Sequence, residues 1–96
     1  MNILDTEEGK ELMQRVTVGL DTKAFLRSDL GGFLVDRLNQ QRKLALVELE
    51  KADPDDAKAI RAIQNEAYIP LMILQSIDEA IEAYKLAEER LNQPAE

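Results

Sequence analysis

Ala52-Asp53-Pro54-Asp55-Asp56 is the stretch that decides the fold of this 96-residue chain. Asp53 is a residue type that caps helix N-termini, and Pro54 suits the first helical position because a missing N–H costs nothing there. Asp55 and Asp56 bring negative charge to the first turn, where the helix dipole favours it. We therefore expect one helix to end at this bend and another to begin at Pro54.

Apolar residues on both sides of the bend follow helical spacing. Before it, the stripe through Leu34, Leu38, Ala45 and Leu49 predicts a helix over about 29–52. After it, a strict alternation of three and four predicts a coiled-coil-like face on a helix over about 54–92. The positions of that face are Ile60, Ile63, Ala67, Pro70, Leu74, Ile77, Ile81, Tyr84, Glu88 and Leu91. Proline removes a backbone hydrogen bond, so we expect this helix to be kinked near Pro70 rather than divided in two.

The N-terminal part of the chain predicts a further helix. Either Asp5 or Thr6 can cap it, and Leu12, Met13, Val16 and Leu20 follow at helical spacing. We expect this helix over about 6–19, ending near Gly19, and a second short turn from Asp21. Gly31-Gly32 leaves open whether the next helix begins at Asp29 or only at Phe33. The expected fold is all-α, an antiparallel helical hairpin of 29–52 and 54–92 with an N-terminal helix, in one domain spanning 1–96.

The two arms of the expected hairpin differ in length. The first has about 24 residues and the second about 38, a difference of roughly 21 Å at 1.5 Å per residue. Residues 78–92 therefore extend beyond the paired region, and their apolar face needs cover. The N-terminal helix can supply it within the chain, or another subunit can supply it from outside, and the sequence leaves both open.

Residues 67–74 are apolar around nearly the whole helix, which is typical of a segment covered on all sides. Packing of the first helix, an oligomer interface and a membrane-contacting patch are the alternatives, and the missing basic flanks disfavour the membrane. We expect a homo-oligomer. The predicted interaction residues are Ile69, Ile73, Leu74, Ile77, Ile81 and Tyr84.

The charge of the chain is acidic and uneven. The formal net charge is −7, and residues 54–96 hold 9 acidic and 4 basic residues. An acidic surface repels phosphate, which argues against direct nucleic-acid binding and against docking on anionic membranes. The densest acidic surface comprises Asp78, Glu79, Glu82, Glu88 and Glu89. It is a solvated helix face, a docking surface for a basic partner or a divalent-cation site, and we expect no metal because histidine is absent and no calcium loop is present.

The residue types that catalysis most often uses are missing. Cysteine and histidine are absent, so no thiol nucleophile or imidazole base is available, and Ser28 and Ser76 have no partner to activate them. Gly31-Gly32 lacks the lysine and spacing of a phosphate-binding loop. We therefore expect no catalytic residues, no cofactor and no enzymatic activity. No secretory signal or membrane span is visible, which predicts a cytoplasmic location.

Three stretches of the sequence together carry a likeness to known proteins. They are Phe25-Leu26-Arg27-Ser28-Asp29-Leu30-Gly31-Gly32-Phe33-Leu34-Val35-Asp36-Arg37, then the bend at 52–56, and Ile60-Arg61-Ala62-Ile63-Gln64-Asn65-Glu66. These stretches resemble small helical proteins of tailed bacteriophages and prophages. The likeness extends from Thr6-Glu7-Glu8-Gly9 to Ala87-Glu88-Glu89-Arg90-Leu91. It implies a phage-encoded protein without assigned activity, made alongside virion-assembly proteins in a bacterial cell or associated with the virion. No functional residue carries over, and Pro70 departs from the uninterrupted helix expected there.

Three hypotheses about function follow. The first is a non-enzymatic structural or interaction protein that self-associates through helical packing, in virion assembly or as an adaptor to another phage or host protein. The second is an acidic binding module that inhibits or mimics by docking on a basic host protein. The third is a DNA-binding protein with a helix-turn-helix over 6–37, which the lack of a basic recognition helix disfavours.

Overall fold

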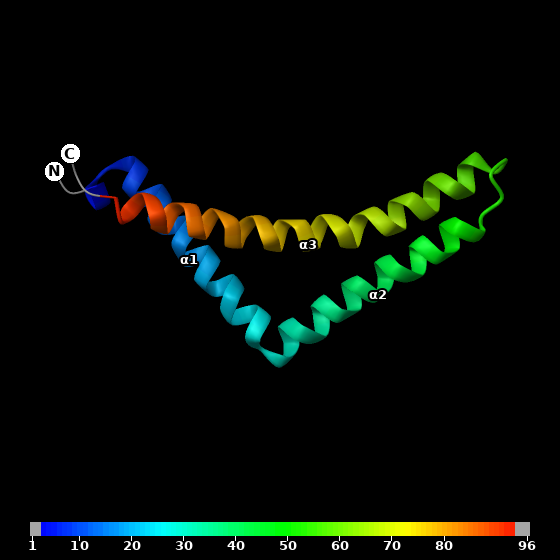
Figure 1. Cartoon of the computed structure of the whole chain (residues 1–96), viewed down its shortest axis with the longest axis horizontal. Helices are drawn as coiled ribbons and strands as arrows, with labels where there is room; N and C mark the ends of the chain where they lie inside the picture. The colour runs from blue at the N-terminus through cyan, green and yellow to red at the C-terminus, as the bar shows by residue number, and fades with distance from the viewer. Residues whose placement is uncertain (1–2, 94–96) are drawn as a thin grey trace.

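The computed structural model describes residues 3–93, and this part of the chain is helical with no strand. A short 3-10 helix η1 (Ile3–Asp5) is followed by α1 (Glu7–Arg27), α2 (Asp29–Lys51) and α3 (Ala57–Leu91). Figure 1 shows α3 as the longest element, with α1 and α2 joined in a V whose corner lies to one side of α3 and whose α1 arm crosses α3 near its C-terminal end. The expected all-α class and the antiparallel hairpin of α2 and α3 are confirmed.

The helices α1 and α2 run one after the other along α3, and both are antiparallel to it. Near the C-terminal end of α3, Glu8 of α1 contacts Arg90, and Gly19 lies against Tyr84. Near the N-terminal end, Gln41 and Ala45 of α2 lie beside Pro70. The overhang predicted beyond the hairpin is therefore covered within the chain by α1, which decides between the two alternatives that the sequence left open.

The corner between α1 and α2 is made by one residue, Ser28. Its extended backbone interrupts the helical path, and its N–H donates to the carbonyl of Phe25. The Ser28 hydroxyl oxygen accepts from the N–H of Gly31 at 3.0 Å, which is the hydrogen bond of an N-cap. The helix α2 therefore begins at Asp29 and includes both glycines.

The predicted end of the first helix near Gly19 is wrong. The helix α1 continues to Arg27, and the short turn predicted from Asp21 is part of it. Gly19 is buried because α1 approaches α3 most closely there: a Cβ at this position would lie 2.1 Å from the Tyr84 Cβ. The glycine therefore permits close helix packing and does not end the helix. Of the two candidate caps at the start of α1, Thr6 accepts from the Gly9 N–H.

The bend at 52–56 separates α2 from α3 as expected, but the capping residue is different. Asp56, and not Asp53, accepts from an N–H of the first turn, that of Ala59 at 3.1 Å. The Asp53 side chain accepts from the N–H of Asp55 instead, and Pro54 lies in the turn before α3. The predicted helix start at Pro54 is therefore three residues too early.

Pro70 bends α3 without dividing it. The helix is continuous from Ala57 to Leu91, with Pro70 in its interior. Figure 1 shows α3 bowed towards the side on which α1 and α2 lie. The proline ring has no N–H to bond to the carbonyl of Glu66 and pushes that carbonyl away, so the helix bends away from the face that carries the ring. Pro70 is buried on the α2 side, which accounts for the direction of the bow.

The three helices form an elongated, open arrangement with very little interior. The molecule measures 63 × 30 × 16 Å along its principal axes. The radius of gyration is 19.2 Å, against about 12.5 Å for a compact domain of this length. Among residues 3–93 the buried hydrophobic side chains are Leu12, Ala45, Ala67 and Ala87. The contacts between the helices therefore bury few side chains completely.

Candidate interaction surface

The α1–α3 half of the molecule is closely packed. Leu12 and Ala87 are buried in it, and Gly19 lets the backbone of α1 approach Tyr84. The Lys23 ammonium lies 4.5 Å from the centroid of the Tyr84 ring, a cation–π arrangement. At the far end the Arg90 Nε donates to Glu8 Oε1 at 3.2 Å. This half is held together by contacts within the chain.

Tyr84 also contacts the acidic end of α3. Hydrogen bonding to Glu88 raises the pKa of the Tyr84 phenol above its ordinary value of 10.0, and desolvation and the negative charge of Glu88 act in the same direction. The phenol therefore stays protonated as a hydrogen-bond donor throughout the neutral range.

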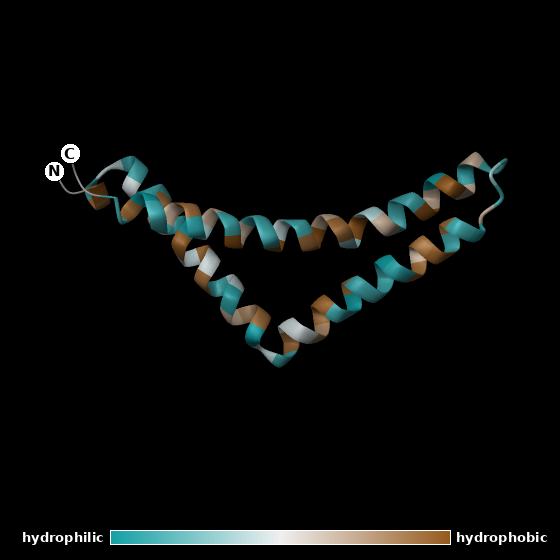
Figure 2. Cartoon of the chain, in the orientation of Figure 1, coloured by the Kyte–Doolittle hydropathy of each residue, from teal (hydrophilic) through white to brown (hydrophobic). Residues whose placement is uncertain are grey.

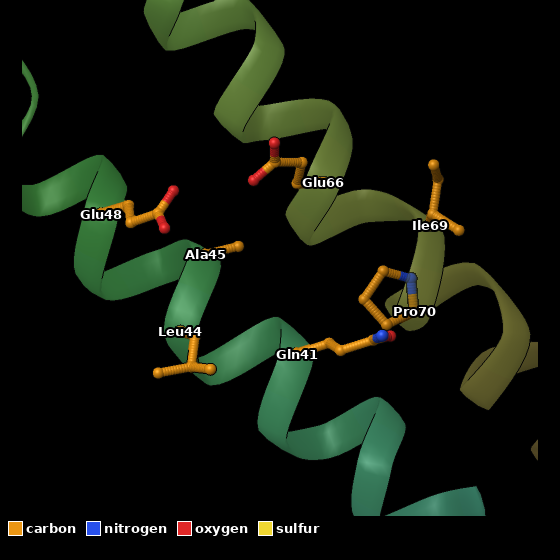
Figure 3. Close-up of a pocket in the computed structure, with 7 residues that line it drawn as sticks. All are labelled: Gln41, Leu44, Ala45, Glu48, Glu66, Ile69 and Pro70. Carbon is orange, nitrogen blue, oxygen red and sulfur yellow. The ribbon is translucent and has the colours of Figure 1, made fainter.

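The α2–α3 half is open along one side, where two cavities adjoin. One has a volume of about 380 Å³ and lies between Gln41, Ala45 and Pro70 (Figure 3). The other has a volume of about 540 Å³ and lies between the α1–α2 corner and the middle of α3. Gln41 lines both cavities, and we call the two together the α2–α3 groove. Its lining residues are Phe25, Phe33, Leu34, Val35, Arg37, Leu38, Gln41, Leu44, Ala45, Glu48, Glu66, Ile69, Pro70, Ile73 and Ile77.

The α2–α3 groove is mostly apolar, and its apolar side chains are exposed. Phe33, Leu44 and Ile69 are each more than half exposed, and Leu34 and Ile73 are only slightly less so. Figure 2 shows hydrophobic segments on α2 next to the corner and on the part of α3 opposite it. Exposed apolar residues that gather in one concave surface are typical of interaction sites, whereas single scattered ones are ordinary.

The charged residues of the α2–α3 groove are divided between its two ends. At the end near the corner, Arg37 lies over the Phe33 ring, with its guanidinium carbon 5.8 Å from the ring centroid. At the other end Glu48 and Glu66 extend into the space between α2 and α3 (Figure 3). Gln41 lies between the basic end and the acidic end. The groove therefore carries positive charge at one end and negative charge at the other.

The six predicted interaction residues fall into two groups. Ile69 and Ile73 are exposed and line the α2–α3 groove, together with the half-buried Ile77. The other three, Leu74, Ile81 and Tyr84, are half-buried. The prediction missed the α2 side of the groove, Phe33, Leu34 and Leu44. Their signal in the sequence is that Phe33 and Leu44 widen the apolar stripe of α2 beyond the face that one partner helix can cover.

The predicted acidic surface residues Asp78, Glu79, Glu82, Glu88 and Glu89 are all exposed on α3. Within residues 3–93 no group of three or more acidic side chains is placed to hold a metal ion. In the same part of the chain no polar or charged residue is buried. None of the helices described has the length and hydrophobicity needed to cross a membrane.

Comparison with known proteins adds no relative: no protein-family model, no curated protein and no solved structure matches this chain. The resemblance to small helical phage proteins therefore stays a prediction. The function proposed below is therefore based on the exposed surfaces of the three helices.

Proposed function

We propose that this chain is a non-enzymatic interaction protein that self-associates through helical packing, as a structural or adaptor component of an assembly. The observation that carries the proposal is the open arrangement of three helices, which leaves many large apolar residues exposed. A helix in a stable domain normally buries its apolar stripe against another element. The helices of this chain leave much of that surface exposed, and association covers it.

The surface area gives the size of the deficit. The chain exposes 7535 Å², whereas a folded monomer of 10.9 kDa exposes about 5,600 Å². About 2,000 Å² more than expected is therefore in contact with solvent, and within residues 3–93 fifteen large hydrophobic residues are exposed. Domain stability is a difference of only about 5–15 kcal/mol, so a deficit of this size favours a permanent partner.

Light scattering on the eluting peak of a size-exclusion column tests the proposal. We expect a mass that is a multiple of 10.9 kDa and a melting temperature that rises with protein concentration, because association stabilises only the folded chain. A monomer that unfolds cooperatively at a temperature independent of concentration contradicts the proposal. A gene for this chain that lies beside the virion-assembly genes of a phage would in addition support the predicted phage origin.

A second candidate function is an acidic module that docks on a basic protein. The exposure of Asp78, Glu79 and Glu82 on one stretch of α3 favours it. Binding of this kind weakens as salt is added, because exposed charges are screened. Reversal of these three charges is expected to abolish capture of basic proteins; a triple variant that captures the same proteins at the same salt concentration contradicts this function.

A further inference from the structure

We infer that a second copy of this chain docks on the α2–α3 groove, with a two-fold axis passing close to Gln41, so that the exposed apolar residues around the groove of each copy pack against those of the other. The inference rests on the proposed self-association and adds the surface, the partner and the orientation. It combines three observations: the exposed apolar lining of the groove, the area that the open arrangement leaves uncovered, and the positions of the charged residues along the groove.

The exposed area is large enough for a second copy. Each chain exposes about 2,000 Å² more than a compact monomer of its mass, which exceeds the roughly 800 Å² per partner that an interface of standard size buries. A second copy of the same chain presents the same apolar residues and is present in equal amount.

The shape and composition of the α2–α3 groove suit helices as occupants. It lies between two antiparallel helices and is lined along its length by Phe33, Leu44, Ile69 and Ile73. Apolar side chains on one helix pack into such a trough when they lie at helical spacing, as Phe33 and Leu44 do. The same side chains that line the groove project from it, so two copies face each other with matching surfaces.

The charged residues of the groove determine how the two copies are oriented relative to each other. Arg37 lies four residues before Gln41 on α2, about 6 Å along the axis, and Glu48 lies seven residues after it, about 10 Å along. A two-fold axis near Gln41 reverses the direction of α2 and brings Arg37 of each copy towards Glu48 and Glu66 of the other. A long arginine side chain spans the remaining difference. A two-fold interface is self-complementary in this way, because any contact between two different residues occurs twice.

Charge reversal in two separate variants tests both the partner and the orientation. The first variant is Arg37→Glu, and the second is Glu48→Arg with Glu66→Arg. Each variant alone meets like charge at both symmetric contacts, and we expect self-association on the order of 100-fold weaker than in the parent chain. A one-to-one mixture restores both contacts at once, so we expect a dimer of mixed composition with close to parental affinity.

Matched controls carry the same charge changes outside the groove. Arg15→Glu on α1 is the control for the first variant, and Glu79→Arg with Glu82→Arg on α3 is the control for the second; all three residues are exposed and do not line the groove. A pair of apolar residues gives an independent control. Ile69 and Leu86 are 56% and 57% exposed, but only Ile69 lines the groove, so Ile69→Asp should dissociate the dimer and Leu86→Asp should not.

Native mass spectrometry separates homodimers from mixed dimers by mass, so it measures the outcome for each variant and for their mixture. Separate dissociation of the two variants followed by a mixed dimer supports the inference. If the parent self-associates and both groove variants do so equally well, the groove is not the interface, although the proposed function stands. If the variants dissociate but their mixture stays monomeric, the reciprocal docking of a second copy is wrong. If the parent itself is a monomer, both the inference and the proposed function fail.

Discussion

The two halves of this molecule use the same helix, α3, in different ways. In the α1–α3 half, a glycine faces a tyrosine and two buried residues, Leu12 and Ala87, fill the contact. In the α2–α3 half, the buried residues are Ala45, Ala67 and Pro70, and larger apolar side chains lie on the exposed side of the contact. Across residues 3–93, one side-chain ion pair and hydrogen bond, between Arg90 and Glu8, links α1 to α3, and none links α2 to α3.

The difference shows what closes a contact between two helices. The alternation of three and four along α3 runs through both halves, so this spacing alone does not decide. What differs is the size and position of residues on the opposing helix: Gly19 lets a large ring fill the space, whereas Ala45 leaves a groove beside the small contact. Both halves keep exposed apolar residues, such as Leu20 and Leu86 in the α1–α3 half, but the α2–α3 half gathers them along a groove.

The largest expected effect is at the corner that joins the two halves. A Cβ at Gly31 would lie 1.6 Å from the carbonyl oxygen of Phe25, which is backbone and has no room to move. We expect Gly31→Ala to lower the free energy of unfolding by about 3 kcal/mol, measured by urea denaturation followed by circular dichroism.

The neighbouring glycine is the control for the corner. A Cβ at Gly32 meets nothing within 4 Å. Gly32→Ala should therefore raise the free energy of unfolding by about 0.5–1 kcal/mol, because alanine costs less conformational entropy than glycine in a helix. Equal effects of the two substitutions would show that the corner is not built around Gly31.

Hydrogen exchange sharpens the comparison of the two halves directly. Association that covers the groove should slow the exchange of amides that open locally in α2 and in residues 66–73. At protein concentrations about 100 times the dissociation constant, the expected slowing is roughly 100-fold. Amides of α1 and of residues 80–88 should change less by local opening, because that half is packed within the chain. Uniform slowing along the chain would count against a groove-centred interface.

Closure of the α1–α3 half depends on Gly19. Alanine here brings a Cβ to 2.1 Å from the Tyr84 Cβ, so α1 must move away from α3. We expect Gly19→Ala to destabilise the chain by about 2 kcal/mol, although alanine at an unconstrained helical position stabilises. The sign of the change in a urea melt decides: a stabilised variant means that the two helices do not approach closely at this point.

The ion pair between Glu8 and Arg90 should contribute little. Both side chains are about half exposed, and exposed pairs contribute about 0.2–1 kcal/mol. A double-mutant cycle with Glu8→Gln and Arg90→Gln should give a coupling energy towards the lower end of that range, and a smaller one in high salt. A coupling that does not respond to salt would indicate a contact other than a solvent-exposed ion pair.

The smallest effect concerns the ionisation of Tyr84. Since its pKa is raised in the folded chain, folding holds the phenolic proton more tightly than the unfolded chain does. The contribution of Tyr84 to the free energy of unfolding is therefore fully present below pH 10. This contribution is lost as the pH rises from about 10 through the folded-state pKa. Ultraviolet difference titration of the parent against Tyr84→Phe isolates this group. Glu88→Gln should move its midpoint down, because it removes the negative charge and the strongest acceptor.

Much of the architecture follows from the sequence because it is encoded by local chemistry. The spacing of apolar residues in α2 and α3 and the turn-forming residues between them predicted the hairpin, and its unequal arms predicted the overhang. The errors lie where two chemically similar residues compete or where a glycine has two uses. Asp53 and Asp56 both suit a helix cap, and only the geometry of the turn decided for Asp56. Gly19 resembles a helix end in sequence and is a packing position in space.

The sequence by itself determined that the chain forms helices, where they bend and which faces are apolar, because these depend on residues within a few positions of one another. Tertiary structure alone decided that α1 covers the end of α3 and that α2 leaves a groove beside it. Those outcomes depend on the sizes of side chains that meet from distant parts of the chain. The tertiary structure also brings Arg37, Gln41, Glu48 and Glu66 into one groove. The groove is positive at one end and negative at the other only because α2 and α3 lie side by side.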